Sequence, residues 1–316
     1  MSNTISDKLL HLYNNINDGL AYCNSKLIEK AEYATNIYNI GDIINSIGTL
    51  DSVLKKNIVT LSVNSIARVK DYALRDFTSL KTVNLPNCSD IGHMAFDGCT
   101  SLTSIELPVC NAIDDYAFSD CISLTSVDLP ICSIIGTQAF DGCNSLSSVY
   151  LLGCKTIDVS AFRNCRLLSS VNLPVCSYIG YEAFYNCRSL LSIDLPACSY
   201  ISTGAFYNCS LLTLVSLPVC NYLGGSAFYN CRSLLSIDLP ACSYIDSYAF
   251  SSCKSLTLVN LPVCNYLGSS AFYDCSSLAS VDLPVCSIIG RSVFYGCRSL
   301  TTLKLGYSGV VRLDNK

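Results

Sequence analysis

Hydrophobic residues recur along most of the chain with a fixed period of 22 positions. Within one unit, Ile105 and Leu107 alternate with the polar residues Ser104 and Glu106. Because neighbouring strand residues face opposite sides, this alternation predicts a short half-buried β-strand. The period is marked most clearly by ten phenylalanines: Phe96, Phe118, Phe140, Phe162, Phe184, Phe206, Phe228, Phe250, Phe272 and Phe294. A fixed period of about 20–50 residues predicts a repeat architecture such as a solenoid.

The remainder of each unit returns the chain along a second wall. Pro108 ends the predicted strand, because proline has no N–H to donate to a ladder. Ile113, Ala117 and Phe118 then supply the apolar residues of the returning segment. A single coil cannot bury both of its apolar walls, so successive coils must stack on one another.

The unit from Leu102 to Ile113 carries leucine or isoleucine at its first, fourth, sixth and twelfth positions and cysteine at its ninth. This spacing resembles the leucine-rich-repeat signature, with cysteine where asparagine is common. The following Ala117-Phe118-x-x-Cys121 resembles the BspA-like branch of that family. The resemblance covers about residues 58–305. It implies a leucine-rich-repeat solenoid with parallel β-strands on a concave face and an irregular or short-helical convex side.

The repeat begins imperfectly at Ile58 and ends at Leu305. In the first unit, Ile66 and Phe77 occupy the two positions that hold cysteine in later units. Counting strands from Ile58 gives about 12 coils, or about 58 Å of column at ~4.8 Å per strand. We therefore predict three regions: a helical segment over residues 1–57, the solenoid over 58–305 and a C-terminal cap or tail over 306–316.

Residues 1–57 follow a helical pattern, with apolar residues in steps of three and four: Ile5, Leu9, Leu12, Ile16, Leu20, Cys23, Leu27, Ala31, Ala34 and Tyr38. Such steps place the side chains on one helix face. This helix either caps the first coil or serves as a docking or homo-oligomerisation module. The residues from Ile5 to Leu12 also resemble N-terminal segments of phage and prophage tail-associated proteins.

Twenty cysteines run from Cys88 to Cys297 at a strict spacing of 11 residues. Apolar residues fill both positions in the first unit, so the thiols act as small hydrophobic side chains in two inward ladders. Equivalent cysteines in adjacent coils would lie ~4.8 Å apart, whereas disulfides prefer Cβ atoms about 3.5–4.5 Å apart. We therefore predict buried, reduced thiols. Disulfide bonds and metal binding are the alternatives, although no C-x-x-C pair occurs.

A net charge of −4 and a pI of about 5.1 argue against a nucleic-acid partner. No run of about 18 apolar residues predicts a membrane-spanning helix. The segment from Met1 to Leu12 lacks the basic and apolar regions of a signal peptide. We therefore expect cytoplasmic synthesis, followed by assembly into a virion or by export without a classical signal.

Sequence motifs for catalysis are lacking. The two histidines, His11 and His93, are far apart, and no nucleophile-elbow, dinucleotide-binding, zinc-protease or phosphate-loop motif occurs. Cys99 lies near His93, but no histidine accompanies the other cysteines, and a nucleophile needs a base within reach. We therefore predict a non-enzymatic protein without cofactor or metal.

Two sets of surface residues are candidates for ligand binding. On the predicted concave face, Leu214 and Leu258 stand where other coils have serine or threonine, and the acidic ladder there includes Asp194, Asp238 and Asp282. That ladder is either a solvated face or a ligand surface, and calcium between Glu106 and Asp128 is a third interpretation. Tyrosines form two stripes, Tyr178, Tyr200, Tyr222, Tyr244 and Tyr266, and then Tyr185, Tyr207, Tyr229, Tyr273 and Tyr295. Each stripe either packs along the column or presents an aromatic surface.

Solenoids expose long faces to their ligands, and the BspA-like resemblance implies adhesion and contact with host surfaces. The leading prediction is therefore a binding or adhesion scaffold whose ligand is a protein or a glycan. The alternative is a structural protein of a phage or prophage tail, with the N-terminal helix for docking and the solenoid as receptor-binding tip.

Overall fold

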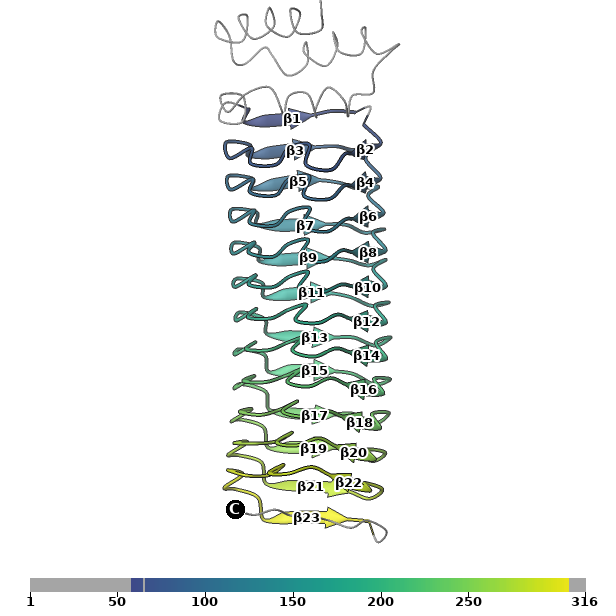
Figure 1. Cartoon of the computed structure of the whole chain (residues 1–316), viewed down its shortest axis with the longest axis vertical. Helices are drawn as coiled ribbons and strands as arrows, with labels where there is room; N and C mark the ends of the chain where they lie inside the picture. Colours follow the sequence, from purple (N-terminus) through teal and green to yellow (C-terminus); the bar gives the residue numbers. More distant parts are fainter. Residues whose placement is uncertain (1–57, 65, 307–316) are drawn as a thin grey trace, which may run out of the picture.

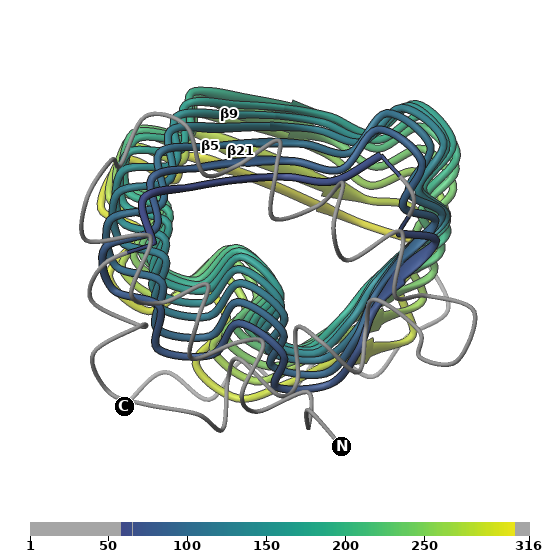
Figure 2. The same cartoon turned by 90° about the horizontal axis from the view of Figure 1, so that it is seen from above.

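The computed structural model describes residues 58–64 and 66–306, which form a tall column of stacked coils (Figure 1). Each full coil contributes one strand of three or four residues and one strand of two residues. The odd-numbered and even-numbered strands lie on different walls of the coil (Figure 2). The predicted helix of residues 1–57 and most of the predicted C-terminal cap lie outside the described residues.

The odd-numbered strands are the predicted half-buried strands, and their number agrees with the prediction. They are β1 (Thr60–Ser62), β3 (Thr82–Asn84), β5 (Ser104–Glu106), β7 (Ser126–Asp128), β9 (Ser148–Tyr150), β11 (Ser170–Asn172), β13 (Ser192–Asp194), β15 (Leu214–Ser216), β17 (Ser236–Asp238), β19 (Leu258–Asn260), β21 (Ser280–Leu283) and β23 (Thr302–Leu305). Pairing is parallel and shifted by one repeat, as in Ser192 opposite Leu214.

The even-numbered strands form one continuous 11-stranded parallel sheet. They are β2 (Arg68–Val69), β4 (Asp90–Ile91), β6 (Ala112–Ile113), β8 (Ile134–Ile135), β10 (Thr156–Ile157), β12 (Tyr178–Ile179), β14 (Tyr200–Ile201), β16 (Tyr222–Leu223), β18 (Tyr244–Ile245), β20 (Tyr266–Leu267) and β22 (Ile288–Ile289). Turns complete each coil. No helix occurs among the described residues, so the short-helical side predicted by the resemblance is wrong for this part of the chain.

The predicted concave face is also wrong. The column is nearly straight in Figure 1, and in Figure 2 its middle coils are displaced toward the odd-strand wall, so that this wall bows slightly outward. A horseshoe requires the outer wall to repeat at a wider spacing, as when helices pack about 8–10 Å apart. Here β-strands on both walls repeat at ~4.8 Å, so neither wall lengthens relative to the other.

The core is a stack of identical side chains. The rings from Phe96 to Phe294 lie one above the other with centroids 5.0–6.0 Å apart and planes within 8° of parallel. Leu190, Ile193 and Leu195 illustrate the buried residues of one coil that face this stack. Every coil thus covers the apolar surface of the next, as the repeat predicts.

Both cysteine ladders face inward as free thiols, in agreement with the prediction. The thiol of Cys110 donates to the carbonyl of Ala112 at 3.3 Å, and that of Cys121 donates to the carbonyl of Phe96, in the preceding coil, at 3.2 Å. The same two hydrogen bonds recur along each ladder, a role that hydrophobic character alone does not predict. In the first coil, Phe77 fills its position without such a bond and is fully buried.

Two residues in each coil adopt left-handed backbone conformations at fixed positions. The second of these positions holds glycine, asparagine, aspartate or serine, and the first three tolerate this conformation best. Asparagines there also bond to their copies: the amide of Asn208 donates to Asn186, and that of Asn230 donates to Asn208, both at 2.7 Å. This buried amide ladder ties the turns together along the column.

We expect the ladder cysteines to resist alkylation in the folded protein and to react fully after denaturation without reductant. Burial raises the pKa of Cys132 and Cys176 to about 11 and that of Cys198 to about 12. Very little thiolate, the reactive form, is therefore present at about pH 8. Iodoacetamide labelling, resolved by peptide mass spectrometry, measures the modification of each cysteine.

Cys297, which is only partly buried, serves as the internal control and should be labelled first. Uniform labelling of the folded ladders at neutral pH would contradict their burial. A shortfall of half the thiols after denaturation would instead reveal disulfide bonds.

Candidate functional site

The odd-strand face presents exposed side chains on either side of a buried residue. In β13, Ser192 and Asp194 are exposed while Ile193 between them is buried, and β17 repeats this arrangement. The predicted aspartates lie exposed on this face, together with Leu214 and Leu258, which are 60% and 56% exposed. The aspartates on this face are Asp194, Asp238 and Asp282.

The first tyrosine stripe occupies the first position of the even-numbered strands from β12 to β20: Tyr178, Tyr200, Tyr222, Tyr244 and Tyr266. Consecutive rings stack with centroids 4.3–5.4 Å apart, and each side chain is half-buried. Desolvation and a hydrogen bond with Tyr266 raise the pKa of Tyr244 to about 12. Most ring faces therefore contact other rings, and mainly edges and hydroxyls remain for solvent.

The second stripe lies in the turns that follow the buried phenylalanines. Tyr207 stacks on Tyr185 at 4.9 Å and on Tyr229 at 4.6 Å. The buried Ser251 interrupts the stripe, which resumes with Tyr273 and Tyr295, 5.1 Å apart. Packing against neighbouring coils is thus common to both stripes.

The structure does not gather the predicted residues into one site. The aspartates and leucines lie on the odd-strand wall, whereas Tyr178 and its stacked neighbours lie on the even-strand wall, across the corner formed by the prolines (Figure 2). The sequence places residues within a repeat but does not show which walls are joined. The two walls are separate candidate surfaces.

Two exposed leucines of the odd-strand face were not recognised from the sequence. Leu191 and Leu235 directly precede β13 and β17, and they are 52% and 55% exposed. Their signal was available, because the same position holds threonine or serine in most other coils, as at Thr125 and Ser147. A further exposed stripe follows the prolines at the corner: Val109, Ile131, Val175, Val219, Val263 and Val285.

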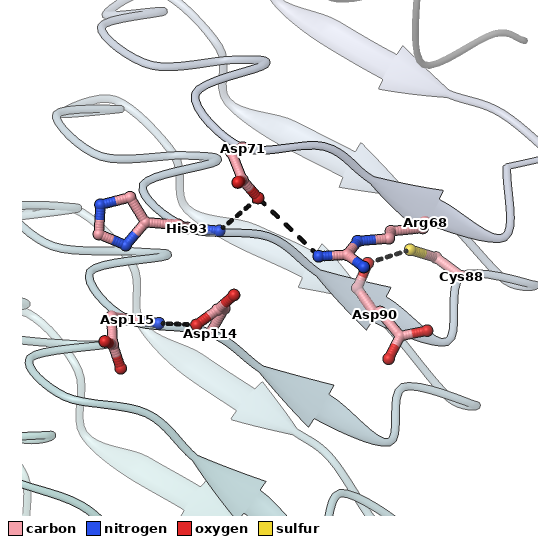
Figure 3. Close-up of polar contacts among 7 residues, drawn as sticks. All are labelled: Arg68, Asp71, Cys88, Asp90, His93, Asp114 and Asp115. Carbon is pink, nitrogen blue, oxygen red and sulfur yellow. Dashed lines mark hydrogen bonds and ion pairs between the residues drawn. The ribbon is translucent and has the colours of Figure 1, made fainter.

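Charged groups in the first coils cap turns. Figure 3 shows the carboxylates of Asp71 and Asp114 beside backbone amides, which donate from His93 at 3.1 Å and from Asp115 at 2.8 Å. Asp71 also forms an ion pair with Arg68 at 3.9 Å. These contacts explain the cluster of charges by local structure.

The histidine and cysteine noted in the sequence have different partners. The His93 ring packs edge-on between Tyr72 and Tyr116, with centroids 5.3 and 5.7 Å away. Cys99 is buried, and its thiol donates to the carbonyl of Leu74 at 3.1 Å. Neither arrangement activates a thiol. Among the described residues, no three or more histidine, cysteine or acidic side chains gather where they could hold a metal ion.

A column of stacked parallel strands with this leucine and cysteine repeat is a leucine-rich-repeat solenoid. The chain belongs to the BspA type leucine rich repeat region family, whose six-copy pattern matches residues 67–190, 133–257 and 177–301. This family and fold are generally those of non-enzymatic scaffolds. No helix that could cross a membrane occurs in the described part of the chain.

Solved structures show the same fold. A leucine-rich repeat protein from Bacteroides ovatus is 24% identical, with 79% of each chain covered and a TM-score of 0.51. A leucine rich cell surface protein from Faecalibacterium prausnitzii is 22% identical over 78% of this chain and 79% of that one, with a TM-score of 0.33. A leucine-rich repeat protein from Eubacterium ventriosum is 17% identical over 78% and 84%, with a TM-score of 0.42. Among curated proteins, no relative matches the chain.

We expect the first tyrosine stripe to stabilise the column. Replacing Tyr200, Tyr222 and Tyr244 together with serine removes four stacked ring pairs. At about 0.5–1.5 kcal/mol per pair, the free energy of unfolding should fall by roughly 2–6 kcal/mol. Denaturant unfolding followed by circular dichroism measures the change.

The matched control is Tyr150→Ser, which removes a 52% exposed tyrosine of the odd-strand face. It should change the unfolding free energy by less than about 0.5 kcal/mol. If the triple variant were as stable as the control, the rings would not be structural, and the stripe would become the stronger candidate for ligand contact.

Proposed function

We propose that this protein is a non-enzymatic scaffold that binds a protein ligand on the odd-strand face of its solenoid. The observation that carries the proposal is the exposure of large apolar side chains there, with Leu214 at 60% and Leu258 at 56%. Neighbouring coils hold serine at this position, so the fold does not require leucine. Exposed apolar groups that gather on one face of a soluble protein mark interaction sites.

The shape of the column supports this proposal. Strands β13 to β21 follow one another along one wall (Figure 1), so a ligand can contact several coils at once. The backbone is held by hydrogen bonds between coils, such as that from Thr213 N to Leu191 O at 2.9 Å. A preorganised surface loses little conformational freedom on binding.

A protein ligand fits the surface better than a glycan. Aromatic sites for sugars present ring faces, whereas the rings from Tyr178 to Tyr266 use most of their faces for stacking on each other. The odd-strand face instead combines leucines with aspartates, a mixture suited to apolar and charged side chains of a protein. Adhesion follows when that ligand is on a cell surface.

The interpretation as a phage or prophage tail protein depends on docking or oligomerisation through residues 1–57. Those residues lie outside the described part of the chain, so this role and the division at residue 57 stay predictions from the sequence. The proposed ligand-binding role of the solenoid is independent of them.

We expect the fluorescently labelled full chain to bind saturably to at least one type within a panel of bacterial and animal cells. The expected Kd is about 1 μM or tighter. Protease treatment of the cells should abolish binding, and glycosidase treatment should leave it intact. Flow cytometry over a concentration series measures both effects.

The opposite sensitivity, loss after glycosidase and survival after protease, would identify a glycan ligand and contradict the protein-ligand proposal. Lack of saturable binding across the whole panel would contradict an adhesion role. The heat-denatured chain, labelled in the same way, controls for non-specific attachment of apolar segments.

A further inference from the structure

Four exposed leucines lie on consecutive coils of the odd-strand face. Leu191 and Leu235 precede β13 and β17, while Leu214 and Leu258 begin β15 and β19. Their exposed fractions are 52%, 55%, 60% and 56% respectively. Four half-exposed leucines in a row are unusual beside the serines and threonines of this face in earlier coils.

The strand register places these leucines next to one another. Ser192 lies opposite Leu214, so Leu191 is one residue from that pair, and Ser236 lies opposite Leu258 in the same way. The leucines therefore alternate between two adjacent positions on coils that are each ~4.8 Å apart. We call this group, Leu191, Leu214, Leu235 and Leu258, the leucine patch.

The leucine patch weakens the column where it occurs. At the position of Leu191, hydroxyls elsewhere donate to the preceding coil, as Ser147 does to Thr125 O at 3.0 Å and Ser169 does to Ser147 O at 3.1 Å. Leu191 and Leu235 have no hydroxyl and interrupt this series. Their side chains gain little burial in exchange, because each remains more than half exposed. Packing within the chain therefore does not explain the leucines.

Acidic groups adjoin the leucine patch on the same face. Asp194, Asp238 and Asp282 are exposed at the ends of alternate strands. Asp238 accepts a hydrogen bond from the Asn260 amide at 2.8 Å, but ion pairs between described residues involve other acids. The basic side chains of this face are at its two ends, Lys81 and Lys304.

The charge of this face selects the kind of partner. A second copy of the chain, docked by the same face, would bring three aspartates toward three aspartates, and like charges in a desolvated interface are costly. A partner segment carrying lysine or arginine among apolar residues complements both the aspartates and the leucines. The four leucines then become the apolar centre of the interface, and the aspartates its charged rim.

We propose that the leucine patch with Asp194, Asp238 and Asp282 is a docking surface for a basic, apolar segment of a partner protein. This inference rests on the proposed function and specifies its ligand chemistry. The leucines supply the apolar contact, and the aspartates orient the partner and speed its association.

The repeat itself supplies conservative test variants. A leucine variant, Leu191→Thr, Leu214→Ser, Leu235→Thr and Leu258→Ser, installs residues found at the same positions of neighbouring coils. An aspartate variant, Asp194→Asn, Asp238→Asn and Asp282→Asn, installs the residue of Asn172 and Asn260. The matched control, Ile131→Ala with Val175→Ala, removes similarly exposed apolar groups at the proline corner.

The probe is a fluorescent heptapeptide of alternating lysine and leucine, compared with lysine–serine and glutamate–leucine peptides of equal length. We expect the full-length protein to bind the lysine–leucine peptide most tightly by fluorescence anisotropy. The leucine and aspartate variants should each weaken binding about tenfold or more, and the control should not. The aspartate variant should also lose most of the salt dependence of binding.

Equal binding by the leucine variant, or equal affinity for the lysine–serine peptide, would overturn the proposal, because general acidity would then explain the attraction. Thermal unfolding is the second readout. The leucine variant restores two hydroxyl donors and should melt no lower than the unmodified protein; a clear drop would show that the leucines serve the fold. If the variant kept its binding to cells, this inference would fail while the proposed function stood.

Discussion

The stacking of each coil on the next, in parallel and one strand spacing apart, is the constraint on which the whole structure depends. One coil has apolar residues on both of its broad sides and cannot bury them alone. Backbone hydrogen bonds join the coils on the turn side as well as in the strands, as from Leu74 N to Ala95 O at 2.8 Å and from Asp76 N to Asp97 O at 2.8 Å. A change in the length of any coil would misalign every contact beyond it.

This constraint places each side chain beside its own copy, so only residues that tolerate their copies fit. Phenylalanine rings stack on themselves, and asparagine amides both donate and accept, as Asn186 does between Asn164 and Asn208. Cysteine fits for another reason: each thiol donates to a carbonyl and needs nothing from the next thiol. Carboxylates repel their copies, and from β11 to β21 the aspartates accordingly alternate with neutral residues.

Much of this fold could be predicted from the sequence, because the features concerned repeat within the 22-residue unit. The strand at Ser104–Glu106, the inward phenylalanines and the inward cysteines all follow from alternation and period. The even-numbered strands could not be recognised, since two residues such as Ala112–Ile113 are too few to show alternation. The straight column follows from those missed strands. The grouping of Leu191 with Leu214 required the register, which joins residues 23 positions apart.

In a column held together by repetition, the departures from the repeat carry the functional information. Residues 187–201 and 231–245 are identical, so the chain from that point repeats in pairs of coils. Each pair places two leucines and one aspartate on the odd-strand face, first Leu191, Asp194 and Leu214, and then Leu235, Asp238 and Leu258. The two sets lie ~10 Å apart along the column. A partner that contacts one set is already positioned for the second, so the second contact forms at high effective concentration. Duplication of a coil pair thereby strengthens binding without any change in the individual contacts.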